Sequence, residues 1–292
     1  QLLNRLDIPG GLRAMSRAEV LLKAGLYATA RDELASALDE FERRGLAMDR
    51  AETLLLAVQA AELDGDLDAA MDYSIEMLDQ LNEQARPGWT AAARAVAFGV
   101  HCRAGSGDES VAEETNSLIR LLIEAGHRAL IPGVLLSAAG ALIDQGNVEE
   151  ATRLVNDARV SCRTPEMRSV LALTESRLLE LAGRRSDALD ALDIGFRYLE
   201  EEIQLLGGVD IAAMAATTLV GIVEAAKRLL APTDATDDFL VWADRGRQAA
   251  SWRWPRLEDP EIARLLNQLR ALSPADEPPG EAKSQTREQL RL

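Results

Sequence analysis

The stretch AGLYATARDELASAL, residues 24–38, decides the fold because versions of it recur along the chain. Three clear copies are DGDLDAAMDYSIEML (64–78), QGNVEEATRLVNDAR (145–159) and AGRRSDALDALDIGF (182–196), and a weaker copy, SGDESVAEETNSLIR, covers 106–120. Each clear copy has a glycine, an alanine five positions later, and an apolar or small residue four and seven positions beyond that alanine. Self-similarity of this kind indicates a repeat protein.

The alanines that anchor the copies set the length of the repeat. They are spaced by 40, 42, 39 and 37 residues and are Ala30, Ala70, Ala112, Ala151 and Ala188. A period of about 40 residues is typical of stacked helix pairs. The glycine ends the first helix in a left-handed turn that a Cβ would disfavour, and the small alanine lets the second helix pack closely against the first. Because one pair cannot bury its own apolar face, neighbouring pairs stack into a solenoid.

The composition supports helices throughout. The chain is 47% hydrophobic but only 4% aromatic, and it is rich in Ala and Leu, which favours helix over strand. No segment alternates with a period of two for long enough to predict a strand. We therefore expect an all-α fold, a solenoid of about six helix pairs with capping helices at its C-terminal end. The expected helices cover residues 12–24, 27–44, 49–63, 66–83, 89–104, 109–125, 129–145, 147–161, 165–181, 184–206, 210–230, 235–249 and 260–272.

Four short motifs predict helix starts. SRAE at Ser16 and DRAE at Asp49 have the spacing of a capping box. The tripeptides that begin at Thr164 and Asp259 each supply a cap residue, a proline for the first helical position and a carboxylate for the first turn.

The repeat resembles the tetratricopeptide repeat (TPR) family over residues 11–206. The second helix of each pair is the better match, through the pattern G-x4-A-x3-apolar-x2-small. The first helix departs from the family because its aromatic residue is missing. Its small residue is kept as Ala18, Ala139 and Ser176 but is replaced by Val58 and Val100 elsewhere. The resemblance implies a right-handed α-α superhelix that binds peptides or another domain.

In the TPR family the first helices line a concave groove. Carried over from the anchoring glycines, the groove positions here are Glu19, Lys23, Glu52, Gln59, Glu62, Arg94, His101, Asp144, Arg177 and Glu180. Their mixed charge suits a polar groove that holds an extended segment of a partner. The alternative is that these side chains simply face solvent.

The stretch FLVWADRGRQAASWRW, residues 239–254, holds three of the four tryptophans of the chain. Helical spacing turns Trp242 inward, whereas Arg245 and Arg247 are expected to keep their charged ends in water. We expect this helix to cap the open end of the solenoid, because the last unit must cover an apolar face. Two further tryptophans, at 252 and 254, are expected to pack under it.

The same region resembles a second family. VWADRGRQAAS followed by LEDPEIARLLNQLR is similar to the segment that joins TPR arrays to the CHAT domain in actinobacterial proteins, as is the opening at LDIPGG. The matching residues are Trp242, Ala243, Asp244, Arg245, Gly246 and Arg247, followed by Asp259, Pro260 and Glu261. CHAT domains are caspase-like cysteine protease domains with a His–Cys dyad. The resemblance implies that such a domain, absent from this sequence, lies C-terminal to it.

Several classes of function are disfavoured by the charge and by the residues that are missing. A net charge of −16 repels nucleic-acid phosphates and anionic membranes, and no apolar run is long enough to cross a bilayer. Cys102 and Cys162 match no disulfide framework or metal spacing, so we expect both to be buried. His101 precedes Cys102 directly, and adjacent helical residues point about 100° apart, so they cannot form a catalytic pair with each other. We predict no catalytic residue, no metal and no cofactor.

The predicted organisation is a lead-in at 1–10, a repeat array at 11–230, capping and junction helices at 231–272, and a polar, proline-rich linker at 273–292. The start of the sequence lacks an initiator methionine and a signal-peptide layout, so we expect an internal fragment of a cytoplasmic protein.

Three hypotheses follow for function. We favour a non-catalytic scaffold that binds a protein or peptide partner, its own C-terminal domain included, and controls an attached CHAT domain. The alternative is the sensor arm of a transcriptional regulator or signalling ATPase. A solenoid that is itself an enzyme is disfavoured, because the sequence contains no cluster of titratable residues with the spacing of a catalytic site. The pattern carries no signal for oligomeric state.

Overall fold

Helix is the only regular secondary structure in the residues that the structure describes, which confirms the all-α prediction. The computed structural model describes residues 10–23, 25–84, 86–105, 111–206, 209–233 and 235–251. The α-helices are α2 (Gly10–Lys23), α3 (Tyr27–Arg44), α4 (Ala47–Asp64), α5 (Leu67–Glu83), α6 (Pro87–Arg103), α7 (Val111–Glu124), α8 (Ile131–Asp144), α9 (Val148–Ser161), α10 (Pro165–Leu181), α11 (Arg185–Leu206), α12 (Val209–Leu230) and α13 (Thr236–Ser251). A short 3₁₀ turn, η1 (Arg128–Leu130), precedes α8.

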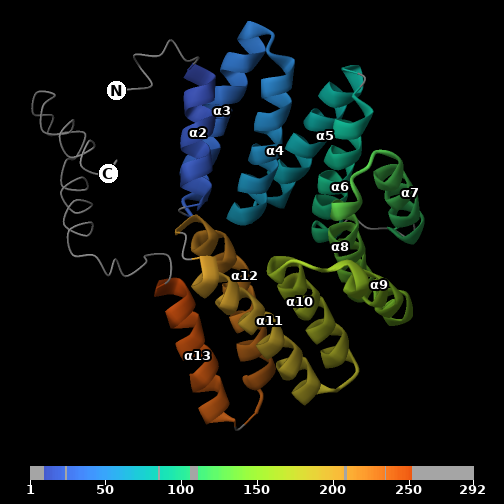
Figure 1. Cartoon of the computed structure of the whole chain (residues 1–292), viewed down its shortest axis with the longest axis vertical. Helices are drawn as coiled ribbons and strands as arrows, with labels where there is room; N and C mark the ends of the chain where they lie inside the picture. The colour runs from blue at the N-terminus through green and yellow to red at the C-terminus, as the bar shows by residue number, and fades with distance from the viewer. Residues whose placement is uncertain are drawn as a thin grey trace, which may run out of the picture. The chain divides into compact units, whose positions relative to one another are not determined.

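The helices form successive pairs within one compact unit, as Figure 1 shows. We call α2, α4, α6, α8, α10 and α12 the A helices, and α3, α5, α7, α9, α11 and α13 the B helices. Each A helix packs against the B helix that follows it, and each B helix packs against the next A helix. Consecutive A helices also touch, directly or through an ion pair. Contacts between neighbouring pairs are how a helical repeat protein extends its core.

Glycine turns separate A from B helices as the repeat predicts. All four glycines of the clear copies have positive φ, and Gly65, with φ of 83°, illustrates the arrangement. The Gly65 N–H donates to Glu62 at 3.2 Å and the Asp66 N–H donates to Ala61 at 2.9 Å, which closes α4. The Asp66 side chain then accepts the Ala69 N–H at 3.1 Å and caps α5. One glycine therefore ends an A helix and places the cap of the B helix.

The anchoring alanines of the four clear copies are buried between the helices. Ala30, Ala70, Ala151 and Ala188 are all 0% exposed, which confirms the packing role predicted for the clear copies. Ala112, in the weaker copy, is only half-buried. The third pair, α6 and α7, therefore departs from the others.

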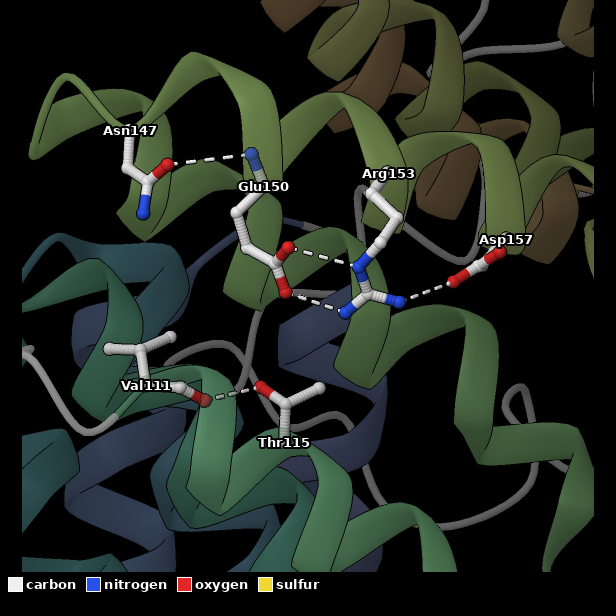
Figure 2. Close-up of polar contacts among 6 residues, drawn as sticks. All are labelled: Val111, Thr115, Asn147, Glu150, Arg153 and Asp157. Atoms are coloured by element: carbon white, nitrogen blue, oxygen red, sulfur yellow. Dashed lines mark hydrogen bonds and ion pairs between the residues drawn. The ribbon is translucent and has the colours of Figure 1, made fainter.

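The departure has a cause in the sequence. Four positions after the anchoring alanine, the clear copies place a buried side chain, whereas the weaker copy has the exposed Asn116. The third pair makes the least extensive A–B contact of the array. α7 keeps its own core contacts, because Leu118 and Leu122 are buried and the buried Thr115 hydroxyl donates to the Val111 carbonyl at 2.6 Å (Figure 2). The third pair is therefore a well-formed but partly opened unit.

The predicted helix caps are partly wrong. Ser16 lies inside α2, and Asp49 lies in the first turn of α4, whose N-cap is Leu46. The Leu46 carbonyl accepts the Arg50 N–H at 3.0 Å, because the preceding left-handed glycine starts the helix earlier than the polar motif does. The predicted cap at Thr164 is confirmed, since its hydroxyl accepts the Met167 N–H at 3.2 Å.

An additional cap opens α9 and was not singled out from the sequence. Figure 2 shows the side-chain oxygen of Asn147 accepting the Glu150 N–H at 3.4 Å. The Glu150 carboxylate binds Arg153 at 2.5 and 2.9 Å, and Arg153 reaches Asp157 at 3.0 Å. Hydrogen bonding to Arg153 lowers the pKa of Glu150. These exposed pairs support the outer face of the helix.

Candidate functional site

The ten side chains predicted for a groove all belong to A helices. Glu19, Gln59, Arg94, Asp144 and Glu180 are exposed, and Glu52, Glu62, His101 and Arg177 are half-buried. The side chain of Lys23 lies outside the described residues. The structure divides most of the remaining positions into two groups, one engaged in ion pairs and one lining a pocket.

The first group forms ion pairs between neighbouring A helices. Glu62 on α4 pairs with Arg103 on α6, and Asp144 on α8 pairs with Arg177 on α10. Glu180 on α10 faces a third arginine, Arg228 on α12, at 3.5 Å. Four of the predicted groove residues therefore bind a neighbouring A helix of the array.

The second group lines an open pocket of 600 Å³ among α5, α6 and α7. Arg94 and His101 are the two predicted groove residues found there. The other lining residues are Met71, Ser74, Ile75, Leu78, Ala97, Phe98, Glu114, Ser117, Leu118, Arg120, Leu121 and Glu124. The volume falls within the range of about 300–1,000 Å³ typical of ligand pockets.

The pocket combines an apolar floor with charged edges. Phe98 and Leu118 are buried, whereas Ile75 is 54% exposed and presents its side chain to any occupant. Arg94 and Glu124 make no hydrogen bond or ion pair with any described residue. Mostly apolar walls with a few convergent polar groups are typical of ligand pockets in general.

The two cysteines are buried, as predicted. Cys102 and Cys162 are 4% and 5% exposed, and both are free thiols. Burial, assisted by the charge of Glu114, raises the pKa of Cys102 to about 12. His101 lies at the pocket while its neighbour Cys102 lies in the core, so the two do not act together.

Metal-binding clusters and membrane-spanning helices are both absent from the described residues. Within those residues, no group of three or more His, Cys, Asp and Glu side chains is arranged to hold a metal ion. None of the helices in that part of the chain is both long and apolar enough to span a bilayer.

The junction stretch is built around an aromatic pair. Trp242 faces inward, as predicted, and is only 6% exposed. Its ring meets that of Phe196 on α11 edge-on, with 5.9 Å between the ring centroids. Arg245 stacks over both rings, at 4.7 Å from Trp242 and 5.3 Å from Phe196, and binds Asp193 at 2.7 Å. The side chain of Arg245 remains 30% exposed, and a carboxylate and two aromatic faces also hold it against the protein.

The remaining junction residues have separate roles. A Cβ on Gly246 would lie 2.9 Å from Cγ1 of Val223, so this glycine lets α13 approach α12 closely. Asp244 pairs with Arg247, which stays 80% exposed at its side chain, as predicted. The motif therefore fixes the last helix of the described array. The tryptophans at 252 and 254, the helix predicted at 260–272 and the linker at 273–292 lie outside the described residues.

Comparison with protein-family models finds no match to the chain, and a search of curated proteins finds none either. The TPR and CHAT resemblances therefore rest on the residue patterns alone.

The pocket itself was not predicted from the sequence. Its signal is the weak repeat copy at 106–120, whose Asn116 replaces the buried residue of the other copies. A change of that kind predicts a looser helix pair. It does not show that α5, which belongs to the preceding pair, supplies part of the pocket lining.

Proposed function

We propose that this chain is a non-catalytic, TPR-like interaction scaffold that works in the cytoplasm and binds a protein or peptide partner. The observation that supports this most is the order of contacts, in which each helix packs on its neighbours in the chain and consecutive A helices meet. Such arrays expose much surface for their size and bind partners along it. The open pocket over α6 provides one concave part of that surface.

We further propose that the array controls an attached CHAT domain and has the right-handed superhelical twist of TPR proteins. Support comes from the resemblance of the Trp242–Arg247 stretch to the TPR–CHAT junction. The contacts of Trp242 and Arg245 with α11 would fix the direction in which the chain leaves the array.

The first test is the open reading frame that surrounds this sequence. The proposal expects a caspase-like domain with a His–Cys dyad encoded after residue 292. A helix-turn-helix there, or a P-loop in a preceding domain, would instead favour the sensor arm of a transcriptional regulator or a signalling ATPase.

The second test measures control directly. Protease activity of the longer protein is compared with that of its C-terminal domain alone, and binding of the isolated array to that domain is measured by calorimetry. We expect the array to bind the domain or change its activity. If it does neither, the regulatory part of the proposal is wrong.

A further inference from the structure

The pocket among α5, α6 and α7 has the form of a groove that runs along the helices. Each helix lines it with residues from one side: Met71, Ser74, Ile75 and Leu78 on α5; Arg94, Ala97, Phe98 and His101 on α6; Glu114, Ser117, Leu118, Arg120, Leu121 and Glu124 on α7. Seven residues of helix span about 10 Å, so the groove extends over about two helical turns.

The groove exists because the third pair is partly open. α7 packs against α6 less than any other B helix packs against its A helix, and Ile75 of α5 is left 54% exposed beside the opening. In Figure 1, α6 runs antiparallel to its chain neighbours α5 and α7. An additional helix laid in the groove would meet apolar side chains from all three.

The charges of the lining differ between the two ends of the groove. Because the three helices alternate in direction, His101 and Glu114 lie at one end, and Arg94 lies at the other with Arg120 and Glu124. One end thus carries a carboxylate without an arginine, and the other carries two arginines against one carboxylate. A helix has a partial positive charge at its N-terminus and a partial negative charge at its C-terminus.

We propose that this groove binds an amphipathic α-helix of a partner protein, with the helix N-terminus beside Glu114 and its C-terminus beside Arg94. The inference rests on the proposed function as a scaffold, and it adds the place of binding, the chemistry of the partner and its direction. The partner helix lies antiparallel to α6 and presents apolar residues at positions i, i+3 or i+4, and i+7 to Ile75, Phe98 and Leu118.

Selection from random peptides tests the proposal with the partner still unidentified. A random 16-residue display library is selected on the wild-type chain, and the enriched peptides are synthesised and measured by fluorescence anisotropy and circular dichroism. We expect peptides with apolar residues at helical spacing that gain helicity when bound. Enrichment of proline-rich or extended peptides only, or no enrichment, would overturn the proposal.

Matched variants then locate the site. Ile75→Glu is expected to raise the peptide Kd at least about tenfold, as for loss of a central apolar anchor. The control is Ile194→Glu on α11, which changes an isoleucine of similar exposure, 46%, outside the pocket. Equal loss of binding in both variants, or in neither, contradicts the assigned site. Thermal unfolding of each variant checks that it remains folded.

A charge reversal and a cross-linking measurement test the direction. Arg94→Glu should raise the Kd about two- to fivefold, the size of a helix-dipole contribution, whereas Arg163→Glu on an exposed loop should not. A photo-crosslinker at the peptide N-terminus should label the Met71 end of the groove, and one at the C-terminus should label the Leu78 end. The reverse labelling would overturn the proposed direction. Binding on the A helices elsewhere would overturn the site while leaving the scaffold function in place.

Discussion

The packing of the fifth helix pair makes a sharp prediction at Gly195, which stands seven residues after the anchoring Ala188. A Cβ added at Gly195 would lie 2.6 Å from the Cβ of Ala172 on α10. Carbon atoms normally meet at about 3.5–4.0 Å, so α10 and α11 would have to move apart by about 1 Å. That movement would also stretch the bond from the Ser169 hydroxyl to the Gly195 carbonyl, which is now 2.7 Å long.

Two effects oppose each other when Gly195 becomes alanine. Helix propensity favours alanine by about 1 kcal/mol. Overpacking costs about 1–3 kcal/mol, and weakening a buried hydrogen bond adds about 1 kcal/mol. The steric terms are larger, so we expect Gly195→Ala to destabilise the protein by about 1–3 kcal/mol.

The matched control is Gly221→Ala in α12. Its new Cβ would find only Leu173 at 3.9 Å, an ordinary contact, so helix propensity alone should act and stabilise the protein. In thermal unfolding followed by circular dichroism, Gly195→Ala should lower the midpoint by about 2–10 °C and Gly221→Ala should raise it by about 1–4 °C. If both substitutions raise the midpoint equally, the close contact between α10 and α11 is wrong.

Three further predictions concern other parts of the array. Trp242→Ala removes the edge-on contact with Phe196 and should cost about 3 kcal/mol; amide exchange in α13 should accelerate, and unchanged exchange would contradict the packing of the junction. A double-mutant cycle on Asp144 and Arg177 should give a coupling of at most about 1 kcal/mol that disappears in about 1 M salt; a coupling that persists would show the pair to be shielded from solvent. Burial raises the pKa of Cys102 to about 12, so its thiol should resist iodoacetamide at about pH 8 until guanidinium unfolds the chain. Because the unfolded thiol ionises first, stability should fall as pH rises above about 8.5, and Cys102→Ala should reduce that slope.

The sequence was sufficient to predict the helices. Every described helix begins and ends within two residues of its predicted bounds, because Gly and Pro interrupt the helical pattern at each turn. Capping motifs were less informative. The polar residues at Ser16 and Asp49 have the right spacing, but the chain was already helical before them.

The sequence could not show which face each A helix presents to its neighbours. Glu62 and His101 lie on similar helices, yet Glu62 binds the next A helix and His101 lines the pocket. The difference depends on which neighbouring helix each side chain meets, which the repeat period does not encode. For the same reason, the contact of Arg245 with Phe196 was hidden, because those residues come from α13 and α11.

The most direct test of the scaffold account is hydrogen exchange followed by mass spectrometry on the wild-type chain, with and without a selected helical peptide. The account predicts that the peptide slows exchange in α5, α6 and α7, residues 67–83, 87–103 and 111–124, and leaves α10 to α13 unchanged. No protection at saturating peptide would contradict the scaffold account, whereas protection confined to other helices would contradict the proposed groove and leave the scaffold function in place.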